Sequence, residues 1–404
     1  MAALLRVYYQ AYSGLPRLQW LLALLIFTNR CGTMVLPFLA LYLKERKGLD
    51  PSTAVQFLSI YGAGGIVGAY LGGRLTTRFG AVRVIPLSLV LAAPGYACIP
   101  LWDAQWAIAA NLLCLSVVAE TIRPAIATAT GEYSPPHLLA RAFALNRLAM
   151  NLGMSIGPAI GGVLAARGAW SLLFTVNGAA ALVSAAVALA SFNVRESRHM
   201  TSVDEPRGAG SPWSDRPLLA FLALQVCGAL VFFQVICTLP VYLSEQYRLD
   251  PDQIGLLFVL NTLLIVLLEM VLTDRLHHRP PLRIVAVGTS LVCLGFGGAV
   301  FGSGFGYAAA LTVVWTLGEM LTAPFGITYV ARRAAGRDRG AYMGLNSVSH
   351  AMAFVGAPLV GGLLYRVDPQ LPWWCCLGMA ALLPVGYWRL ERRASQAAQG
   401  ERAA

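Results

Sequence analysis

Apolar stretches of about 20 residues recur along nearly the whole chain, separated by short polar segments or by proline and glycine. A helix needs about 20 such residues to cross the hydrocarbon core of a bilayer. The polar breaks, used as boundaries, therefore predict an all-α membrane protein with twelve spanning helices. The predicted spans are about 18–43, 52–75, 82–101, 105–131, 138–166, 169–193, 215–244, 252–274, 281–302, 305–331, 339–366 and 371–391.

One long polar segment interrupts this pattern between the sixth and the seventh span. It runs over 195–214 and is rich in charged residues, glycine, serine and proline, which is the composition of a linker. The chain is therefore expected to form an N-terminal six-helix bundle over 1–194 and a C-terminal six-helix bundle with a tail over 215–404.

The two predicted bundles repeat each other at positions 200 apart. Because six helices return the chain to the same side of the membrane, the halves are expected to be parallel repeats with pseudo-symmetry about the membrane normal. Repeats of this kind hold a substrate site between them near the midplane. The matching positions include Tyr42-Leu43 with Tyr242-Leu243, Leu49-Asp50-Pro51 with Leu249-Asp250-Pro251, Leu145-Asn146 with Leu345-Asn346, Pro158 with Pro358, and Gly161-Gly162 with Gly361-Gly362.

The distribution of charge predicts the orientation of the helices. Only 12% of the residues are charged, about half of what a soluble domain carries, and the net charge is +11. With the N-terminus in the cytoplasm, most of the 30 Lys and Arg residues fall in cytoplasmic segments, so both termini are expected inside a plasma (inner) membrane. The positive charge then marks topology and contacts with anionic lipid rather than nucleic-acid binding. The basic residues in external loops are Lys44, Arg46, Lys47, Arg167, Arg248 and Arg366.

The sequence offers no chemistry typical of an enzyme. All eight cysteines lie in apolar runs without metal-ligand spacing and are expected to pack as free thiols. No phosphate-binding loop pattern and no Ser-His-Asp arrangement stands out, which argues against ATP as the energy source and against catalysis. We therefore expect no enzyme, no metal site and no cofactor, with a proton gradient as the energy source. The expected partners are a small-molecule substrate, protons and membrane lipids, and the expected state is a monomer.

The segment GGRLTTRFGAVR, at 72–83, resembles the loop between the second and third helices of the major facilitator superfamily. That loop follows the pattern G-x-L-x-D-R-x-G-R-R, and Gly73, Arg78 and Gly80 fit it. Thr77 stands where the pattern has Asp, which puts the usual acid–base latch of this loop in question. Leu75 fits the pattern as well, and Arg83 provides a basic residue at its end. The resemblance implies the major facilitator fold of two six-helix bundles, with a conformational role for Gly73, Arg78 and Gly80.

A second segment makes the resemblance more specific. GMSIGPAIGG, at 153–162, matches without a gap the fifth-helix pattern G-x-x-x-G-P-x-x-G-G of the superfamily's proton-coupled drug antiporters. RGAYMGLNS at 339–347 and PQLPWW at 369–374 are similar to bacterial multidrug members. The chain as a whole thus resembles bacterial proton-coupled multidrug antiporters with twelve helices, and this resemblance implies export.

Gly153, Gly157 and Gly161 are spaced four apart in the fifth predicted span. Such a row of glycines forms a smooth helix face that another helix can approach closely. One interpretation of this face is helix packing alone. The other places it at the interface of the two halves, where it would seal the inward leak and act as a rocking surface. The residues assigned to this interface are Arg147, Gly153, Gly157, Pro158, Gly161, Gly162, Pro358, Gly361 and Gly362.

Ionisable residues inside the predicted spans are costly and indicate function. Glu120 and Arg123 are three residues apart and share a helix face. They form either a static ion pair or, with Arg30, a polar cluster in which the carboxylate takes up and releases a proton as its surroundings change. Glu319 is the corresponding candidate in the second half, with His350 as its partner. The proton-coupling candidates are Glu120, Glu319, Glu269 and His350.

The preferred function is secondary transport by alternating access, with small amphipathic or cationic compounds exported in exchange for protons. The alternative is a proton symporter that imports peptides, organic acids or similar solutes, with Arg30, Arg123 and Arg147 available to bind a carboxylate. A membrane enzyme or a sensor is disfavoured by the two repeated halves. The candidates for the substrate cavity are Asn29, Arg30, Arg123, Gln225, Gln234, Asn261 and Asn346.

Overall fold

The computed structural model describes residues 9, 12–49, 51–191 and 211–403, and every regular element in this part of the chain is helical. Most of the predicted linker lies outside it, so the predicted domain boundary stays a prediction. The first half contains α2 (Arg17–Cys31), α3 (Val35–Lys47), α4 (Pro51–Phe79), α5 (Ala81–Cys98), η1 (Ile99–Leu101), α6 (Gln105–Glu120), α7 (Ile122–Tyr133), α8 (Leu139–Ala166) and α9 (Trp170–Ser191). The second half contains η2 (Pro212–Ser214), α11 (Arg216–Phe232), η3 (Phe233–Val235), α12 (Leu239–Glu245), α13 (Pro251–Leu276), α14 (Pro281–Gly297), η4 (Gly298–Val300), α15 (Phe305–Arg333), α16 (Arg339–Val367) and α17 (Leu371–Ala403).

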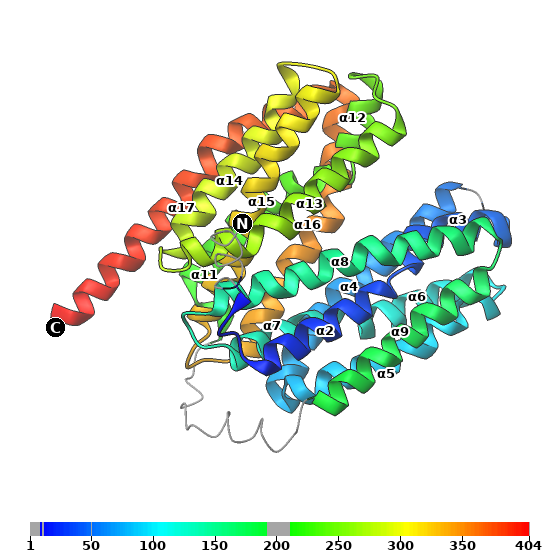
Figure 1. Cartoon of the computed structure of the whole chain (residues 1–404), viewed down its shortest axis with the longest axis horizontal. Coiled ribbons are helices and arrows are strands. Elements are labelled where there is room, and N and C mark those ends of the chain that lie inside the picture. Colours follow the sequence, from blue (N-terminus) through cyan, green and yellow to red (C-terminus); the bar gives the residue numbers. More distant parts are fainter. Residues whose placement is uncertain (1–8, 10–11, 50, 192–210, 404) are drawn as a thin grey trace. The chain divides into compact units, whose positions relative to one another are not determined.

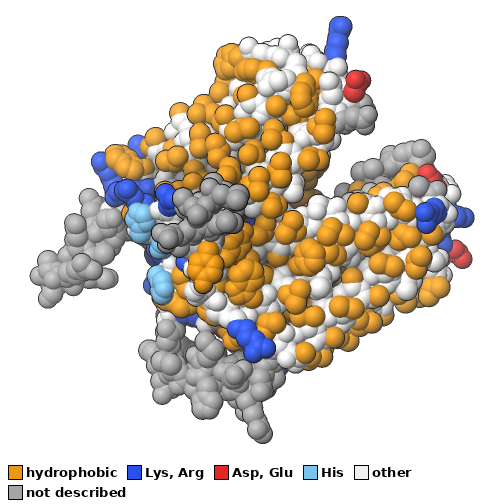
Figure 2. Space-filling model, viewed as in Figure 1, with side chains coloured by type: hydrophobic (Ala, Val, Ile, Leu, Met, Phe, Trp, Pro, Cys, Tyr) orange, Lys and Arg blue, Asp and Glu red, His pale blue; other side chains and the backbone are white. Residues whose placement is uncertain are grey.

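The apolar surface of these helices is that of a membrane protein. Within the described residues, ten helical stretches are long and apolar enough to cross a bilayer. Hydrophobic side chains cover the helix flanks on the face shown in Figure 2, and the charged side chains visible there gather toward helix ends. Leu182, Leu189 and Leu363 are among the large apolar side chains left exposed, which suits contact with lipid. The predicted all-α, multi-pass membrane fold is confirmed.

Contacts between residues divide the chain into two compact units, which we describe separately. The N-unit comprises Leu15–Gly210 and Ala334–Ala351. The C-unit comprises Met1–Gly14, Ser211–Arg333 and Met352–Ala404. Helix α16 thus contributes about its first three and a half turns to the N-unit and the rest to the C-unit, a division that the hydrophobic pattern alone does not predict.

The same helix pairings occur in both units, as expected for repeated halves. In the N-unit, α5 packs along α9 and α4 packs along α6 (Figure 1). In the C-unit, α14 packs along α17 and α13 packs along α15. In each half, the third span therefore packs against the sixth span, and the second span packs against the fourth.

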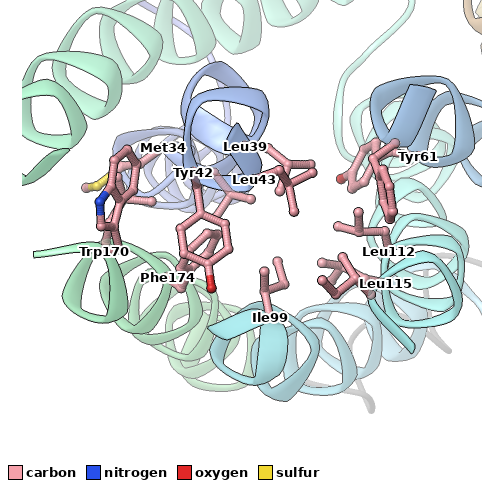
Figure 3. Packing of buried hydrophobic residues seen from close by; sticks show 14 of the residues in the cluster. Met34, Leu39, Tyr42, Leu43, Tyr61, Ile99, Leu112, Leu115, Trp170 and Phe174 are labelled. Atoms are coloured by element: carbon pink, nitrogen blue, oxygen red, sulfur yellow. The ribbon is translucent and has the colours of Figure 1, made fainter. Parts of the chain in front are cut away.

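The apolar core of the N-unit forms around α3. Figure 3 shows Leu39, Tyr42 and Leu43 of this helix beside Trp170 and Phe174 of α9. The Tyr42 ring meets the Phe174 ring edge-on, with 4.7 Å between the ring centroids. Aromatic packing of this kind contributes beyond the area it buries. It fixes α3 against α9, although α3 is separated from α2 by a break in the chain's first span.

Candidate functional site

The first predicted span is broken in the N-unit. Helix α2 ends at Cys31 and α3 begins at Val35, which leaves the backbone amides at the start of α3 without partners in their own helix. The Asn177 Oδ1 atom of α9 accepts hydrogen bonds from the amides of Met34, at 3.1 Å, and Val35, at 3.3 Å. The break is therefore stabilised by a side chain from another span, and Arg30 is placed in the last turn of α2.

The corresponding span of the C-unit is broken in a similar way. After α11 and η3, the chain loses regular helical structure before α12 begins at Leu239. The Gln234 Nε2 atom donates to the carbonyl oxygens of Leu230 and Ala357, each at 3.0 Å, and its Oε1 accepts from Thr238 Oγ1 at 2.6 Å. Gln234, a predicted cavity residue, is thus buried at the break. Broken helices at this position are typical of transporters, where they line the sites of substrates or coupling ions.

The glycine face of α8 packs against the broken first span. A Cβ atom built on Gly157 would lie 2.9 Å from the carbonyl oxygen of Arg30, 3.0 Å from that of Cys31 and 3.1 Å from that of Thr33. A Cβ atom on Gly153 would lie 2.5 Å from the Arg30 Cβ atom. These nearest atoms belong to the same unit, which fits the first of the two interpretations, helix packing; the second interpretation, a face at the interface of the halves, stays a prediction. The tight packing itself follows from the missing side chains.

The other residues of the glycine motif differ in their surroundings. A Cβ atom on Gly161 would lie 2.8 Å from the Phe38 Cε2 atom, so this position is also tight. Gly162 meets only Phe38 Cζ at 3.5 Å, and the side chain of Pro158 lies outside the described part. In the C-unit, a Cβ on Gly361 would collide with the Gln234 and Thr238 side chains, Gly362 faces open space, and Pro358 is exposed within α16.

A cavity of about 70 Å³ lies inside the N-unit beside the break. Four predicted residues line it together: Asn29 and Arg30 of α2, Glu120 of α6 and Arg123 of α7. The Arg123 Nε atom forms an ion pair with the Glu120 carboxylate, whose side chain is 19% exposed. Arg30 interacts electrostatically with both of these charges. The structure therefore assembles the cluster that the sequence predicted from two separate spans.

A second interruption positions Glu120. Helix α6 ends at Glu120 and α7 begins at Ile122, with Pro124 in the first turn of α7. Proline has no backbone N–H, so the carbonyl of Glu120 lacks its usual partner four residues ahead. The carboxylate and Arg123 thus sit at a discontinuity of the fourth span, as Arg30 does in the first.

Several further polar residues of this cavity were not predicted, among them two tyrosines and an asparagine. Tyr61 of α4, Tyr96 of α5 and Asn177 of α9 all line it. The Tyr61 and Tyr96 hydroxyls interact with each other, and that of Tyr96 interacts with Asn177. A single tyrosine or asparagine within an apolar run resembles an ordinary buried residue, so the sequence alone carries no signal for them.

The C-unit holds a smaller polar cluster. The Glu319 Oε2 atom of α15 accepts a hydrogen bond from the Asn261 Nδ2 atom of α13 at 2.9 Å, and the same amide group donates to Thr316 Oγ1 at 3.0 Å. Glu319 is 9% exposed. Glu269, also on α13, is 1% exposed. Two of the predicted residues, Glu319 and Asn261, are therefore direct partners.

The remaining predicted residues do not line the N-unit cavity. His350 belongs to the N-unit, where its Nδ1 atom lies 3.0 Å from the carbonyl oxygen of Asn346 and its ring interacts electrostatically with Arg123. Asn346 itself is buried, Arg147 is part of α8, and Gln225 of α11 lies near Gly326. In the described part of the chain, no three His, Cys, Asp or Glu residues gather as metal ligands would.

The segment that resembles the family's loop has its acidic partner on another helix. The Thr77 hydroxyl of α4 donates a hydrogen bond to the Asp338 carboxylate, which also accepts from the Ala341 amide at 2.9 Å and so caps α16. A Cβ atom on Gly73 would lie 2.7 Å from the Gly344 Cα atom, so the two helices touch through glycines. The carboxylate missing at position 77 is thus supplied by the facing segment of the N-unit.

The other two residues of that loop keep local roles. The Arg78 guanidinium lies over the Phe79 ring, 5.3 Å from its centroid. Gly80 has a φ of +81°, a conformation that side chains rarely adopt, and it allows the sharp turn from α4 into α5.

Changing Thr77 to aspartate is expected to loosen the contact between α4 and the start of α16. Two carboxylates would then face each other where a hydroxyl now donates, whereas Thr77→Val removes only one hydrogen bond to a charged group, about 1.5–3 kcal/mol. Amide hydrogen exchange over 339–345 should be faster in Thr77→Asp than in Thr77→Val. The double variant Thr77→Asp/Asp338→Asn should recover protection, and unchanged exchange in Thr77→Asp would contradict this role.

Broken helices beside a polar cavity, in an all-α membrane protein of repeated halves, are features of secondary transporters. Residues 22–334 match the sequence profile of the Major Facilitator Superfamily, and the chain belongs to this family. It is therefore a multi-pass membrane transporter and not an enzyme.

Individual relatives are distant but cover most of the chain. The protein is 25% identical over 372 residues to a Na(+), Li(+), K(+)/H(+) antiporter of Planococcus maritimus, covering 82% of this chain and 86% of the relative. It is 22% identical over 368 residues to the quinolone resistance protein NorA of Staphylococcus aureus, covering 86% of this chain and 89% of that relative.

Solved structures share the fold. The human organic anion transporter MFSD10 aligns with a TM-score of 0.70 at 16% identity, over 92% of this chain and 99% of that one. A bacterial homologue of the iron transporter ferroportin aligns with a TM-score of 0.73 at 14% identity, over 93% of this chain and 100% of that one. At this level of identity the likeness concerns the fold alone.

Proposed function

We propose that the protein is a proton-coupled antiporter that exports small amphipathic or cationic compounds by alternating access. The observation that carries the proposal is Glu120, a carboxylate inside a membrane span that borders a cavity and pairs with Arg123. Carboxylates in this setting are the usual carriers of protons in transporters. Arg30, at the break of the first span, is the second charge that acts on it.

The proposed coupling follows from two opposing effects on Glu120. A dry environment favours the neutral carboxylic acid, whereas a guanidinium nearby favours the carboxylate. A state that dries the cavity or separates Glu120 from Arg123 takes up a proton, and a state that restores the pair releases it. If the two states open to opposite sides of the membrane, proton flow is coupled to transport.

The proposed substrate class rests on two observations. Glu319 lies inside the C-unit, where the Asn261 amide donates to it, and a membrane carboxylate suits a cationic group. Two relatives are named as a monovalent cation/proton antiporter and as a quinolone resistance protein, and both names fit export of cations or amphipathic compounds. We further propose a monomer in the plasma (inner) membrane, with both termini cytoplasmic and no cofactor.

Reconstitution in proteoliposomes tests the proposal. Vesicles that are acidic inside should accumulate tetraphenylphosphonium, a permanent organic cation that is not trapped by protonation, and an ionophore that collapses the pH gradient should abolish this accumulation. Na⁺ and K⁺ form a second arm, which separates organic from metal cations. Protein-free vesicles are the control. Accumulation that requires acid outside would instead indicate the symporter alternative, and transport that ignores the gradient would contradict proton coupling.

A further inference from the structure

The N-unit cavity contains more positive than negative charge. Of the described residues that line it, Arg30 and Arg123 are the basic ones and Glu120 is the acidic one. The cavity is therefore positive by one charge when Glu120 is ionised. His350 interacts with Arg123 from α16, and its protonation would only add to the excess.

The uncompensated charge is that of Arg30. Glu120 is engaged by Arg123, and no carboxylate among the described residues lies within ion-pair distance of the Arg30 guanidinium. The groups that face Arg30 from the other elements are Glu120, Arg123 and the phenols of Tyr61 and Tyr96. A guanidinium taken away from bulk water is costly unless an anion or several acceptors compensate it.

The neutral groups around Arg30 are suited to an anion. The Tyr61 and Tyr96 hydroxyls and the Asn29 and Asn177 carboxamides border the same space, and hydroxyl and amide groups can donate to an anion. A guanidinium binds a carboxylate through two parallel hydrogen bonds. The cavity of about 70 Å³ is several times the roughly 10–15 Å³ that one water needs, so it has room for a carboxylate or a halide with water.

We infer that this cavity binds one monovalent anion beside Arg30, either a halide or the carboxylate group of a small organic acid, and that the anion binds more tightly when Glu120 is protonated. Protonation neutralises Glu120 and raises the positive excess of the described lining residues from one charge to two. Binding linkage is reciprocal, so the anion must in turn increase the affinity of Glu120 for its proton. This second part rests on the proposed function of Glu120, and the first part does not.

Anion binding can be measured on the detergent-solubilised full chain by the midpoint of thermal unfolding. Chloride, acetate and benzoate would be titrated separately as sodium salts, with sodium sulfate keeping the ionic strength constant. At least one of the three should raise the midpoint with a saturable dependence, and at lower concentrations in acidic than in alkaline buffer. Saturation by chloride identifies an inorganic occupant, whereas an effect of acetate or benzoate alone identifies a carboxylate.

Variants locate the site. Arg30→Gln should weaken the apparent affinity by about tenfold or more, the loss expected for a charge-assisted hydrogen bond. Arg30→Lys, which keeps the charge but loses the planar fork, should weaken carboxylates more than chloride. Glu120→Gln should bind tightly at every pH. Arg167→Gln, in an exposed external loop, removes the same charge and should bind like the parent protein.

Three results would overturn the inference: no saturable effect of any of the three anions, binding by Arg30→Gln equal to that of the parent, or affinity that falls on acidification. None of these depends on a gradient. If the parent protein binds the anion but shows no transport driven by a pH gradient, the result would count against the proposed function alone.

Discussion

Replacing Gly157 with leucine is expected to remove most of the folded protein. The first side-chain atom alone would lie 2.9–3.1 Å from three backbone carbonyl oxygens, those of Arg30, Cys31 and Thr33. These oxygens belong to the break between α2 and α3, which Asn177 holds in place, so they have little freedom to move. Overpacking of this kind costs about 3 kcal/mol, and leucine adds three more carbon atoms.

The matched control is Gly162, five residues or about one and a half turns further along the same helix. Its Cβ atom would meet only Phe38 Cζ, at an ordinary contact distance of 3.5 Å. Gly157→Ala should lower both the folded yield and the unfolding midpoint, and Gly157→Leu should lower both further. The measurements are size-exclusion chromatography and thermal unfolding in detergent. Gly162→Ala should match the parent. A Gly157→Leu protein as stable as the parent would show that α8 does not press on the break.

Neutralising Glu120 is expected to abolish uphill transport driven by a pH gradient. The glutamine keeps the size of the side chain and can still bond to Arg123, so the protein should fold, but it cannot carry a proton. Exchange of substrate for substrate should survive, because binding and alternation need no net proton release. The measurement is transport in proteoliposomes with and without the gradient, normalised to folded protein.

Two further variants define the result. Glu319→Gln tests whether the C-unit carboxylate shares the coupling, and Glu45→Gln, exposed near the C-terminal end of α3, is the control that should transport normally. Full uphill transport by both Glu120→Gln and Glu319→Gln would exclude both carboxylates as the coupling site. Glu269 and His350 would then be the next residues to test.

The fold could be predicted because its causes are local or repeated. The bilayer fixes the length of each apolar run, and the matches at 200 positions apart reveal the repeat. The cluster of Glu120, Arg123 and Arg30 could also be predicted, since charges within spans are rare enough to be noticed individually. The chemistry of the candidate site was in this sense visible in the sequence.

The breaks in the helices could not be predicted, because what stabilises them is distant in the chain. The partner of the Met34 amide is Asn177, 143 residues away. Gly32 and its polar neighbours Asn29, Arg30 and Thr33 lie within an otherwise apolar span, and a continuous helix can also contain such residues. The same limit applies to Tyr61 and Tyr96, which join the cavity only through the packing of α4 and α5.

The sequence also did not reveal which helices pack against its glycine-rich faces. The sequence predicted that the glycine face of α8 is tightly packed, and the structure shows its neighbour to be the first span of its own unit. Likewise, Gly73 fits the family's loop, but its contact with Gly344 and the bond from Thr77 to Asp338 depend on where 334–351 packs. Such contacts follow from three-dimensional arrangement and leave no periodic trace.

The central claim, that Glu120 carries the coupled proton, is tested most directly by proton release on substrate binding. Tetraphenylphosphonium would be added to the purified protein in weakly buffered detergent solution containing a pH-indicator dye, with binding measured in parallel on the same samples. The parent protein and Glu45→Gln should release protons as the cation binds, and Glu120→Gln should bind it without releasing any. Proton release from Glu120→Gln equal to that of the parent would contradict the assignment of the coupled proton to this carboxylate.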